Sequence, residues 1–260
     1  MPRILITGAA GFLGSHLCDR FIAEGYEVVA MDNLITGDLR NLEHLQALPQ
    51  FSFVHHDVST HIHLNGPLDY ILHFASPASP IDYLKIPIQT LKVGSLGTHN
   101  CLGLALAKNA RILVASTSEV YGTAQYVPMD EGHVLQGQSP YSASKAASDH
   151  LVRAYHHTFG LEVTTSNCSN NYGPFHFPEK LIPVVILNAL QGKPIPVYGA
   201  GENVRDWLYV EDHADALLLV LAQGRVGRSY NIGGENERRN IDLVRTICGI
   251  LDRKRPKARP

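Results

Sequence analysis

A glycine-rich turn between a short apolar run and an amphipathic segment is the feature that most constrains how this chain folds. Residues 3–7 are β-branched and aliphatic, and residues 13–24 have the periodicity of a helix that Gly25 would end. Glycines recur three residues apart between them, at Gly8, Gly11 and Gly14. This order of strand, turn and helix is typical of the first unit of a parallel α/β sheet.

The same alternation continues along the first two thirds of the chain. Further strands are predicted at residues 27–31, 51–55, 70–74 and 111–116, and helices at residues 88–107 and 141–159. Residues 76–87 contain three prolines and are expected to be loop or short turns. The pattern predicts a Rossmann-like, doubly wound parallel sheet with helices on both faces.

Composition changes near residue 170, where prolines and glycines become frequent up to residue 205. We therefore predict a large domain over residues 1–168, to which residues 207–224 return. Residues 169–206 and 225–260 would form a smaller C-terminal lobe that binds the substrate. At 260 residues and 45% hydrophobic composition, the chain is long and apolar enough to bury a large core.

Charge and cysteine content limit the classes of partner and the compartment. A formal net charge of -2 gives no overall attraction to nucleic acid or to an anionic membrane, so neither is predicted as a partner. No apolar run reaches the length of about 18 residues that spans a membrane, and the first strand leaves no room for a signal peptide. The four cysteines are far apart. We expect a cytoplasmic protein with reduced thiols.

A metal site is not predicted, although the chain has fourteen histidines. His61 and His63 would lie on one face of a strand, but no third ligand is evident near them.

The glycine turn and Asp32 together indicate a dinucleotide site. Glycines allow the backbone to approach a pyrophosphate at the helix N-terminus, and an acid at the end of the second strand can accept hydrogen bonds from ribose hydroxyls. The negative charge would repel a 2′-phosphate, so NAD is predicted rather than NADP. The predicted cofactor-binding residues are Gly8, Gly11, Phe12, Leu13, Gly14, Asp32, Asn33, Asp57, Val58, Phe74, Ala75, Tyr141 and Lys145.

A phenol and an ammonium four residues apart, Tyr141 and Lys145, would lie on one face of a helix. The lysine and a bound nicotinamide cation would favour the phenolate, which makes Tyr141 a base for a substrate hydroxyl. Thr117, Ser118 and Glu119 follow the fifth strand, where a substrate would lie, and with Tyr141 and Lys145 they are the predicted catalytic residues. Thr117 can orient that hydroxyl, and Glu119 can act as acid or base on a neighbouring carbon.

Taken together, the three glycines, Asp32, residues 116–122 and the Tyr141/Lys145 pair resemble the extended short-chain dehydrogenase/reductases of the nucleotide-sugar epimerase/dehydratase family. The resemblance implies tightly held NAD, a small substrate lobe, a homodimer joined through a four-helix bundle, and oxidation of the sugar at C4. It also implies a nucleotide-diphosphate sugar (dTDP- or UDP-linked) bound by Asn170, Lys180, Leu181, Val197, Tyr198, Arg205 and Asn231.

Two subfamilies are resembled in different regions. Similarity to dTDP-glucose 4,6-dehydratases covers residues 139–149, 169–174, 178–183, 196–199 and 203–207, and similarity to UDP-glucuronate decarboxylases covers residues 75–83 and 115–122. The dTDP-glucose enzymes normally have an Asp where this chain has Ser118, and serine is not a comparable acid. The related GDP-mannose 4,6-dehydratases have Ser-Glu at these two positions, so Glu119 alone can serve the elimination.

We therefore expect an NAD-dependent lyase, a sugar-nucleotide 4,6-dehydratase that converts dTDP-glucose to dTDP-4-keto-6-deoxyglucose. A UDP-glucuronate decarboxylase, which forms UDP-xylose, is the alternative within the family. A C4 epimerase would need only Tyr141 and Lys145, and the presence of Glu119 argues against it. A non-catalytic NAD-binding protein is the alternative of another class, because family members generally continue further at the C-terminus and the substrate lobe here is expected to be truncated.

Overall fold

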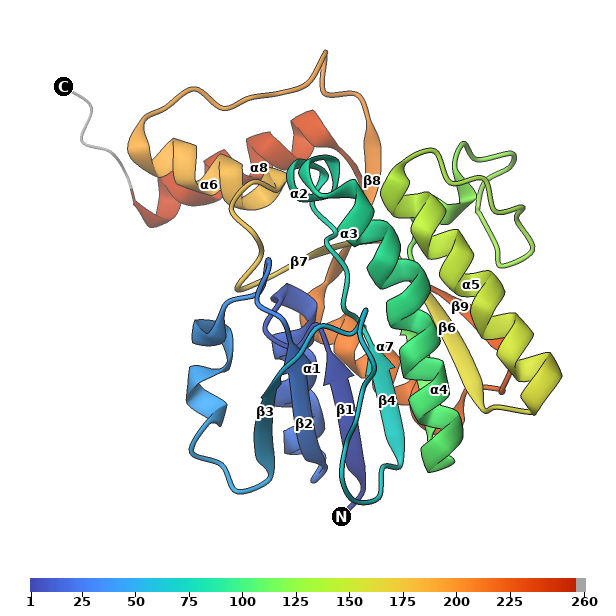
Figure 1. Ribbon diagram of the computed structural model, residues 1–260. Coiled ribbons are helices and arrows are strands. Elements are labelled where there is room, and N and C mark those ends of the chain that lie inside the picture. The colour runs from blue at the N-terminus through green and yellow to red at the C-terminus, as the bar shows by residue number, and fades with distance from the viewer. Residues whose placement is uncertain (256–260) are drawn as a thin grey trace. The chain divides into compact units, whose positions relative to one another are not determined.

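Seven parallel strands form the larger of two sheets in the computed structural model, which describes residues 1–255. The strands are β1 (Arg3–Thr7), β2 (Glu27–Asp32), β3 (Phe51–His55), β4 (Tyr70–His73), β5 (Arg111–Ala115), β6 (Val163–Cys168) and β9 (Arg228–Ile232). Their order is β3-β2-β1-β4-β5-β6-β9, and each neighbouring pair is parallel (Figure 1). The predicted doubly wound α/β fold is confirmed.

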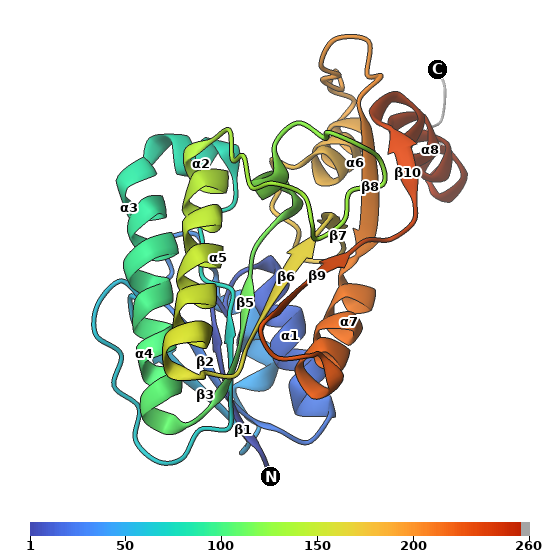
Figure 2. The same ribbon diagram turned by 90° about the vertical axis from the view of Figure 1, so that its right-hand side faces the viewer.

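Helices cover both faces of this sheet, as Figure 2 shows. On one face lie α1 (Phe12–Ala23) and α7 (Val210–Gln223), and on the other lie α3 (Pro87–Lys92), α4 (Thr98–Lys108) and α5 (Pro140–Phe159). The shorter elements are the 3-10 turns η1 (Leu39–Leu45) and η3 (Ser118–Tyr121) and the helix α2 (Pro80–Lys85). Strand residues such as Leu5, Ile71 and Ile112 are fully buried and pack with Leu102 of α4 and Val152 of α5. Burial of these apolar side chains is the main stabilising term of the unit.

The helix predicted over residues 88–107 is interrupted. A π-helical turn, η2 (Val93–Gly97), separates α3 from α4. Two glycines of this turn lie too close to neighbouring elements for a side chain: a Cβ on Gly94 would be 2.7 Å from the Cβ of Ser144, and one on Gly97 would be 2.9 Å from Val58. A π-helical turn contains one residue more than an α-helical turn, and this widening accompanies the close packing. The periodicity of apolar residues in the sequence does not indicate such a turn.

A second compact unit contains Ser169–Val210 and continues from Gly233, whereas the first contains Met1–Cys168 and Glu211–Ile232. The second unit has a sheet of order β10-β8-β7, formed by β7 (Asn170–Tyr172), β8 (Val204–Tyr209) and β10 (Glu237–Arg239). Its helices are α6 (Leu181–Gln191) and α8 (Asn240–Lys254), which pack through Val185, Val244 and Ile247.

Two predicted domain boundaries differ from the structure. Residues 225–232 were assigned to the smaller lobe, but β9 pairs with β6 and completes the large sheet. Residues 207–210 were assigned to the large domain, but Trp207 and Leu208 pair with Asn170 and Asn171 of β7. Both errors arise because strand pairing is set by long-range contacts, whereas composition reports only local preferences.

A buried polar network connects β1, β4, α4 and α5 inside the first unit. The imidazole of His73 lies 2.8 Å from the Thr7 hydroxyl through Nδ1 and 3.3 Å from the Thr98 hydroxyl through Nε2. The Thr98 hydroxyl lies 3.1 Å from that of Ser148, which donates to the carbonyl of Gly94 at 2.6 Å. Burial lowers the pKa of His73 to about 3, so the ring is neutral.

The glycine turn yields a first prediction. A Cβ on Gly14 would lie 2.1 Å from the carbonyl oxygen of Gly8, so Gly14→Ala must displace the turn. We expect Gly14→Ala to lower the melting temperature by several degrees in a circular-dichroism melt. Gly103→Ala is the matched control, because a Cβ there has no atom within 4 Å. Alanine favours a helix over glycine by about 1 kcal/mol, so this control should melt at or above the wild-type temperature. Equal melting of Gly14→Ala and the wild type would contradict the packing described.

The neutral state of His73 yields a pH prediction. Its pKa is depressed in the folded chain, so its contribution to stability is present above the ordinary histidine pKa and is lost as the pH falls toward about 3. Between pH 7 and pH 5 this loss amounts to about 2 kcal/mol. Urea titrations at both pH values should show the loss in the wild type and a smaller loss in His73→Asn. The same pH dependence in both proteins would contradict the prediction.

Candidate active site

The turn between β1 and α1 forms a cradle of backbone that excludes side chains. Gly8 has a φ of +71°, and a Cβ there would lie 2.7 Å from the amide nitrogen of Ala75. Gly11 is the N-cap of α1 and makes no side-chain cap hydrogen bond. The positive end of the helix dipole favours an anionic group such as a pyrophosphate.

Asp32 connects the end of β2 to this turn. Its carboxylate accepts hydrogen bonds from the Ala10 amide at 3.0 Å and from the Leu34 amide at 2.8 Å. Burial raises the pKa of Asp32, although these two bonds oppose the shift. Each carboxylate oxygen retains a second lone pair, so the group can still accept ribose hydroxyls. Asp32 therefore both shapes the turn and presents an acceptor beside it.

The other predicted cofactor residues lie at the same edge of the sheet. The side-chain Nδ2 of Asn33 donates to the Asp57 carboxylate at 3.3 Å, and Val58, the residue after Asp57, is buried. Phe74 and Ala75 follow β4, and their amides donate to the Thr7 hydroxyl at 3.2 and 3.3 Å. The structure thus brings these residues and the glycine turn together because all of them follow the carboxyl ends of neighbouring parallel strands.

Tyr141 and Lys145 of α5 are both buried. The helix begins with a capping box, in which Ser139 accepts from the Ser142 amide at 3.1 Å and the Ser142 hydroxyl accepts from the Ser139 amide at 2.9 Å. The Lys145 ammonium donates to the carbonyl of Ala115 at 2.7 Å, and burial lowers its pKa to about 8. This bond fixes the predicted pair against the end of β5.

Thr117 links the tyrosine to the turn that follows β5. Its hydroxyl caps η3 by accepting from the Glu119 amide at 3.2 Å, and it also shares a hydrogen bond with Tyr141. Burial raises the pKa of Tyr141, and the nearby charge of Glu119 adds to the shift. The Glu119 side chain itself is exposed, and Ser118 beside it is half-buried. Four of the five predicted catalytic residues, Tyr141, Lys145, Thr117 and Glu119, are therefore neighbours. The fifth, Ser118, begins η3 between Thr117 and Glu119.

Three residues near this cluster were missed from the sequence. The ring of Tyr83 stacks on that of Tyr141, with centroids 5.6 Å apart and planes at 10°. His73 supports the Thr7 hydroxyl beneath the glycine turn. Asp149 lies one helical turn beyond Lys145 and is buried. Only its spacing of four from Lys145 could have indicated it, whereas Tyr83 and His73 reach the site through tertiary contacts alone.

The predicted substrate-binding residues divide between the two units. Asn231 lies on β9 of the first unit, and its side chain accepts from the Tyr121 hydroxyl at 2.7 Å. The others belong to the second unit: Asn170, Lys180, Leu181, Val197, Tyr198 and Arg205. Among them, Leu181 and Val197 pack against the apolar cluster between α6 and α8, whereas Tyr198 is 85% exposed. Arg205 is also exposed, and its guanidinium donates to the Val204 carbonyl at 2.9 Å.

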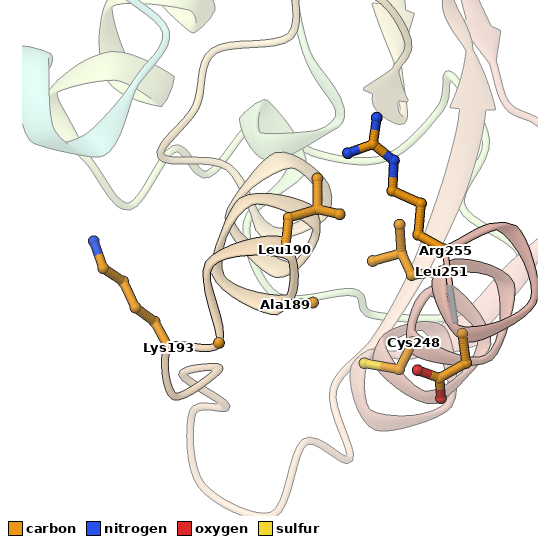
Figure 3. Close-up of a pocket in the computed structure, with 8 residues that line it drawn as sticks. Ala189, Leu190, Lys193, Cys248, Leu251 and Arg255 are labelled. Atoms are coloured by element: carbon orange, nitrogen blue, oxygen red, sulfur yellow. The ribbon is translucent and has the colours of Figure 1, made fainter. Parts of the chain in front are cut away.

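A cavity of about 270 Å³ lies in the second unit between α6 and α8 (Figure 3). Leu190 of α6 and Cys248 and Leu251 of α8 line it, and Lys193 and Arg255 lie at its edge. It contains none of the predicted site residues. Within residues 1–255, no group of three histidine, cysteine or acidic side chains is arranged to hold a metal ion. No helix in the same range is both long and apolar enough to cross a membrane.

Comparisons with known proteins identify the relatives of this chain. It is 46% identical over 274 residues to a dTDP-glucose 4,6-dehydratase of Xanthomonas campestris pv. campestris (strain B100), with 99% of this chain and 78% of the relative covered. It is 42% identical over 283 residues to the dTDP-glucose 4,6-dehydratase of Salmonella typhimurium, with 98% and 78% covered.

Solved structures give the same result. A dTDP-glucose 4,6-dehydratase of Bacillus anthracis in complex with NAD matches with a TM-score of 0.87 and 38% identity, covering 96% of this chain and 81% of that one. The dTDP-glucose 4,6-dehydratase DesIV of Streptomyces venezuelae, with NAD and TYD bound, matches with a TM-score of 0.89, 38% identity and the same coverage. Residues 5–259 match the family described as GDP-mannose 4,6 dehydratase. The chain belongs to that family of dehydratases.

Proposed function

We propose that this protein is an NAD-dependent dTDP-glucose 4,6-dehydratase. The observation that carries the proposal is the cluster of Tyr141, Lys145, Thr117 and Glu119 at the end of β5, in a chain 46% identical to a dTDP-glucose 4,6-dehydratase over nearly its whole length. The reaction oxidises C4 of the sugar, eliminates water across C5 and C6, and reduces C6. The product is dTDP-4-keto-6-deoxyglucose.

NAD fits the residues present in the first unit. The turn at Gly8 and Gly14 leaves no space for a Cβ, so backbone lies where a phosphate can approach it, and the Asp32 carboxylate can accept ribose hydroxyls. Relatives of the same fold were solved with NAD. When bound, NAD accepts a hydride from C4 and later returns it to C6.

The side chains of this protein move the protons of that reaction. Tyr141 removes the proton from the C4 hydroxyl of the sugar. Thr117, which shares a hydrogen bond with Tyr141, orients that hydroxyl. Burial keeps Tyr141 protonated in the chain alone, although Lys145 lies one helical turn away. The positive charge of a bound nicotinamide would add to that of Lys145, so we expect the phenolate to form only in the assembled site.

The elimination depends on Glu119. Oxidation at C4 makes the C5 proton acidic, and the exposed carboxylate of Glu119 removes it. The hydroxyl of Ser118 is not acidic enough to protonate the leaving oxygen at C6. We therefore assign both steps to Glu119, which takes the C5 proton and gives it to the departing hydroxyl as water forms. When C6 is reduced, C5 takes up one proton, which balances the proton that Tyr141 removed from the C4 hydroxyl.

The proposal also includes a site for the nucleotide and a cytoplasmic location. We assign the nucleotide diphosphate to the second unit, where Arg205 and Lys180 offer positive charge and the exposed ring of Tyr198 offers a stacking face. The four cysteines are free thiols, which suit a reducing cytoplasm.

Mass spectrometry of the products tests the activity. Purified protein with NAD⁺ should convert dTDP-glucose to a product that lacks one water. Tyr141→Phe should lower the rate by about 10²-fold or more, because general acid-base catalysis contributes about 10²–10⁴. Tyr155→Phe is the matched control: it makes the same change on the same helix, at a hydroxyl that lies 2.8 Å from the His99 ring.

Other outcomes would overturn this assignment. Loss of CO₂ from UDP-glucuronate, with dTDP-glucose unchanged, would make the chain a decarboxylase and give Ser118 its explanation. Bound NAD without turnover of either substrate would indicate a non-catalytic protein.

We further propose a homodimer formed through the helices on one face of the first unit. Large apolar side chains are exposed along α2, α3 and η2: Leu84, Ile88, Leu91 and Leu96, between 48% and 66% exposed. Large exposed apolar residues on successive helical elements favour an interface, and a second copy of the chain would cover them symmetrically.

Light scattering coupled to gel filtration tests the homodimer. The wild type should elute with the mass of two chains. Leu91→Glu should give monomers, because it would bury a charge in the contact. Leu219→Glu, at a leucine of α7 that is 56% exposed, should leave the mass unchanged. A monomeric wild type would contradict the proposal.

A further inference from the structure

Three consecutive residues at the end of β5 each form a hydrogen bond with one residue of a row of polar side chains on α5. The row is spaced by four positions, so its side chains lie on one face of the helix. Its members are Tyr141, Lys145 and Asp149, and their partners are Thr117, Ala115 and Ser116, respectively. The first two members have roles in the proposed reaction. The third, Asp149, has none so far.

Asp149 is buried, yet only part of its hydrogen-bonding capacity is used. The Ser116 hydroxyl donates to its Oδ2 at 2.9 Å, and within the described residues Oδ1 is buried without a partner. Burial of the carboxyl raises its pKa to about 7. An asparagine could accept the same bond from Ser116 without a charge to bury, so packing alone does not explain an acid here.

Lys145 is the cationic neighbour of this carboxyl. Burial lowers the pKa of Lys145 to about 8, and the charge of Asp149, one turn further along α5, opposes that shift. Without the carboxylate the ammonium would lose its proton nearer to neutral pH. The phenolate of Tyr141 would then lose the positive charge that stabilises it.

Other titratable groups face this row from the elements packed on α5. They are Tyr83 of α2, His73 of β4, Glu119 and Tyr121 of η3, and Cys168 of β6. His73 stays neutral because burial and the charge of Lys145 both lower its pKa. Glu119 is exposed and lies in η3, so solvent screens its charge more than that of the buried Asp149.

We propose that Asp149 is a positioning residue whose negative charge keeps Lys145 protonated beside Tyr141, and that it thereby sets the upper pH limit of the reaction. This inference rests on the proposed function. Ser116 is part of the same arrangement, because its hydroxyl stabilises the ionised carboxylate. In this arrangement the carboxylate and the ammonium are charged together.

The test compares pH profiles of kcat for the wild type, Asp149→Asn and Ser116→Ala. In Asp149→Asn the alkaline limb should move to lower pH by about one unit, because Lys145 loses its counter-charge. Ser116→Ala should move the limb in the same direction by less, since the carboxyl remains. A merely structural role would lower kcat equally at every pH and leave the limb in place, which would overturn the proposal.

Glu162→Gln is the matched control. It removes one acidic charge from an exposed position just after α5 and should leave the profile unchanged. Thermal melts of all three variants verify folding. If Asp149→Asn does not fold, Ser116→Ala decides the question, because an unmoved limb in that variant would also contradict the proposal.

NMR of ¹³C-lysine-labelled protein tests the inference without any turnover. The Cε resonance of Lys145, assigned by its loss in Lys145→Arg, should titrate at lower pH in Asp149→Asn than in the wild type. An unchanged midpoint would overturn the inference even if dTDP-glucose is converted. A shifted midpoint in a protein that converts no sugar nucleotide would support the charge coupling while contradicting the proposed function.

Discussion

All seven strands of the large sheet run in one direction, so their carboxyl ends meet at a single edge. The chemistry assigned to this protein depends on that constraint. Thr7 ends β1, Asp32 ends β2, His73 ends β4 and Ala115 ends β5, and each holds a neighbouring element through a polar contact. An antiparallel strand in the middle would send one of these groups to the opposite edge.

Burial at this edge acts on charge as well as on packing. It lowers the pKa of His73 and Lys145 and raises that of Asp149 and Tyr141, so each group is moved toward its neutral form. Hydrogen bonds from strand ends counteract this where a charge is needed, as the Ala115 carbonyl does for Lys145. Ionisable side chains at this edge can therefore change protonation state when substrate and a positively charged cofactor bind.

Much of the fold and part of the site could be predicted because the signals are local. Apolar patterning predicted five of the seven strands of the large sheet, β1 to β5, whereas β6 and β9 were not predicted. Helix α5 begins one residue before its predicted start, at Pro140, which suits the first turn of a helix. Residues 225–232 were misplaced because Arg228, Ser229 and Asn231 carry no apolar pattern, and only pairing with β6 makes them a strand. The π-turn at Gly94 was missed because its cause, contact with Ser144, lies on another helix.

By itself, the sequence determined the glycine turn, the acid at the end of the second strand, and the spacing of Tyr141 and Lys145. These depend on backbone conformation and on distances of a few residues. Only the tertiary structure decided that Lys145 bonds to Ala115, that Asp149 bonds to Ser116, and that Tyr83 stacks on Tyr141. Such contacts join segments 30 or more residues apart, as with Lys145 and Ala115. Their geometry follows from how the strands pair and how α5 packs on the sheet, which no local pattern encodes.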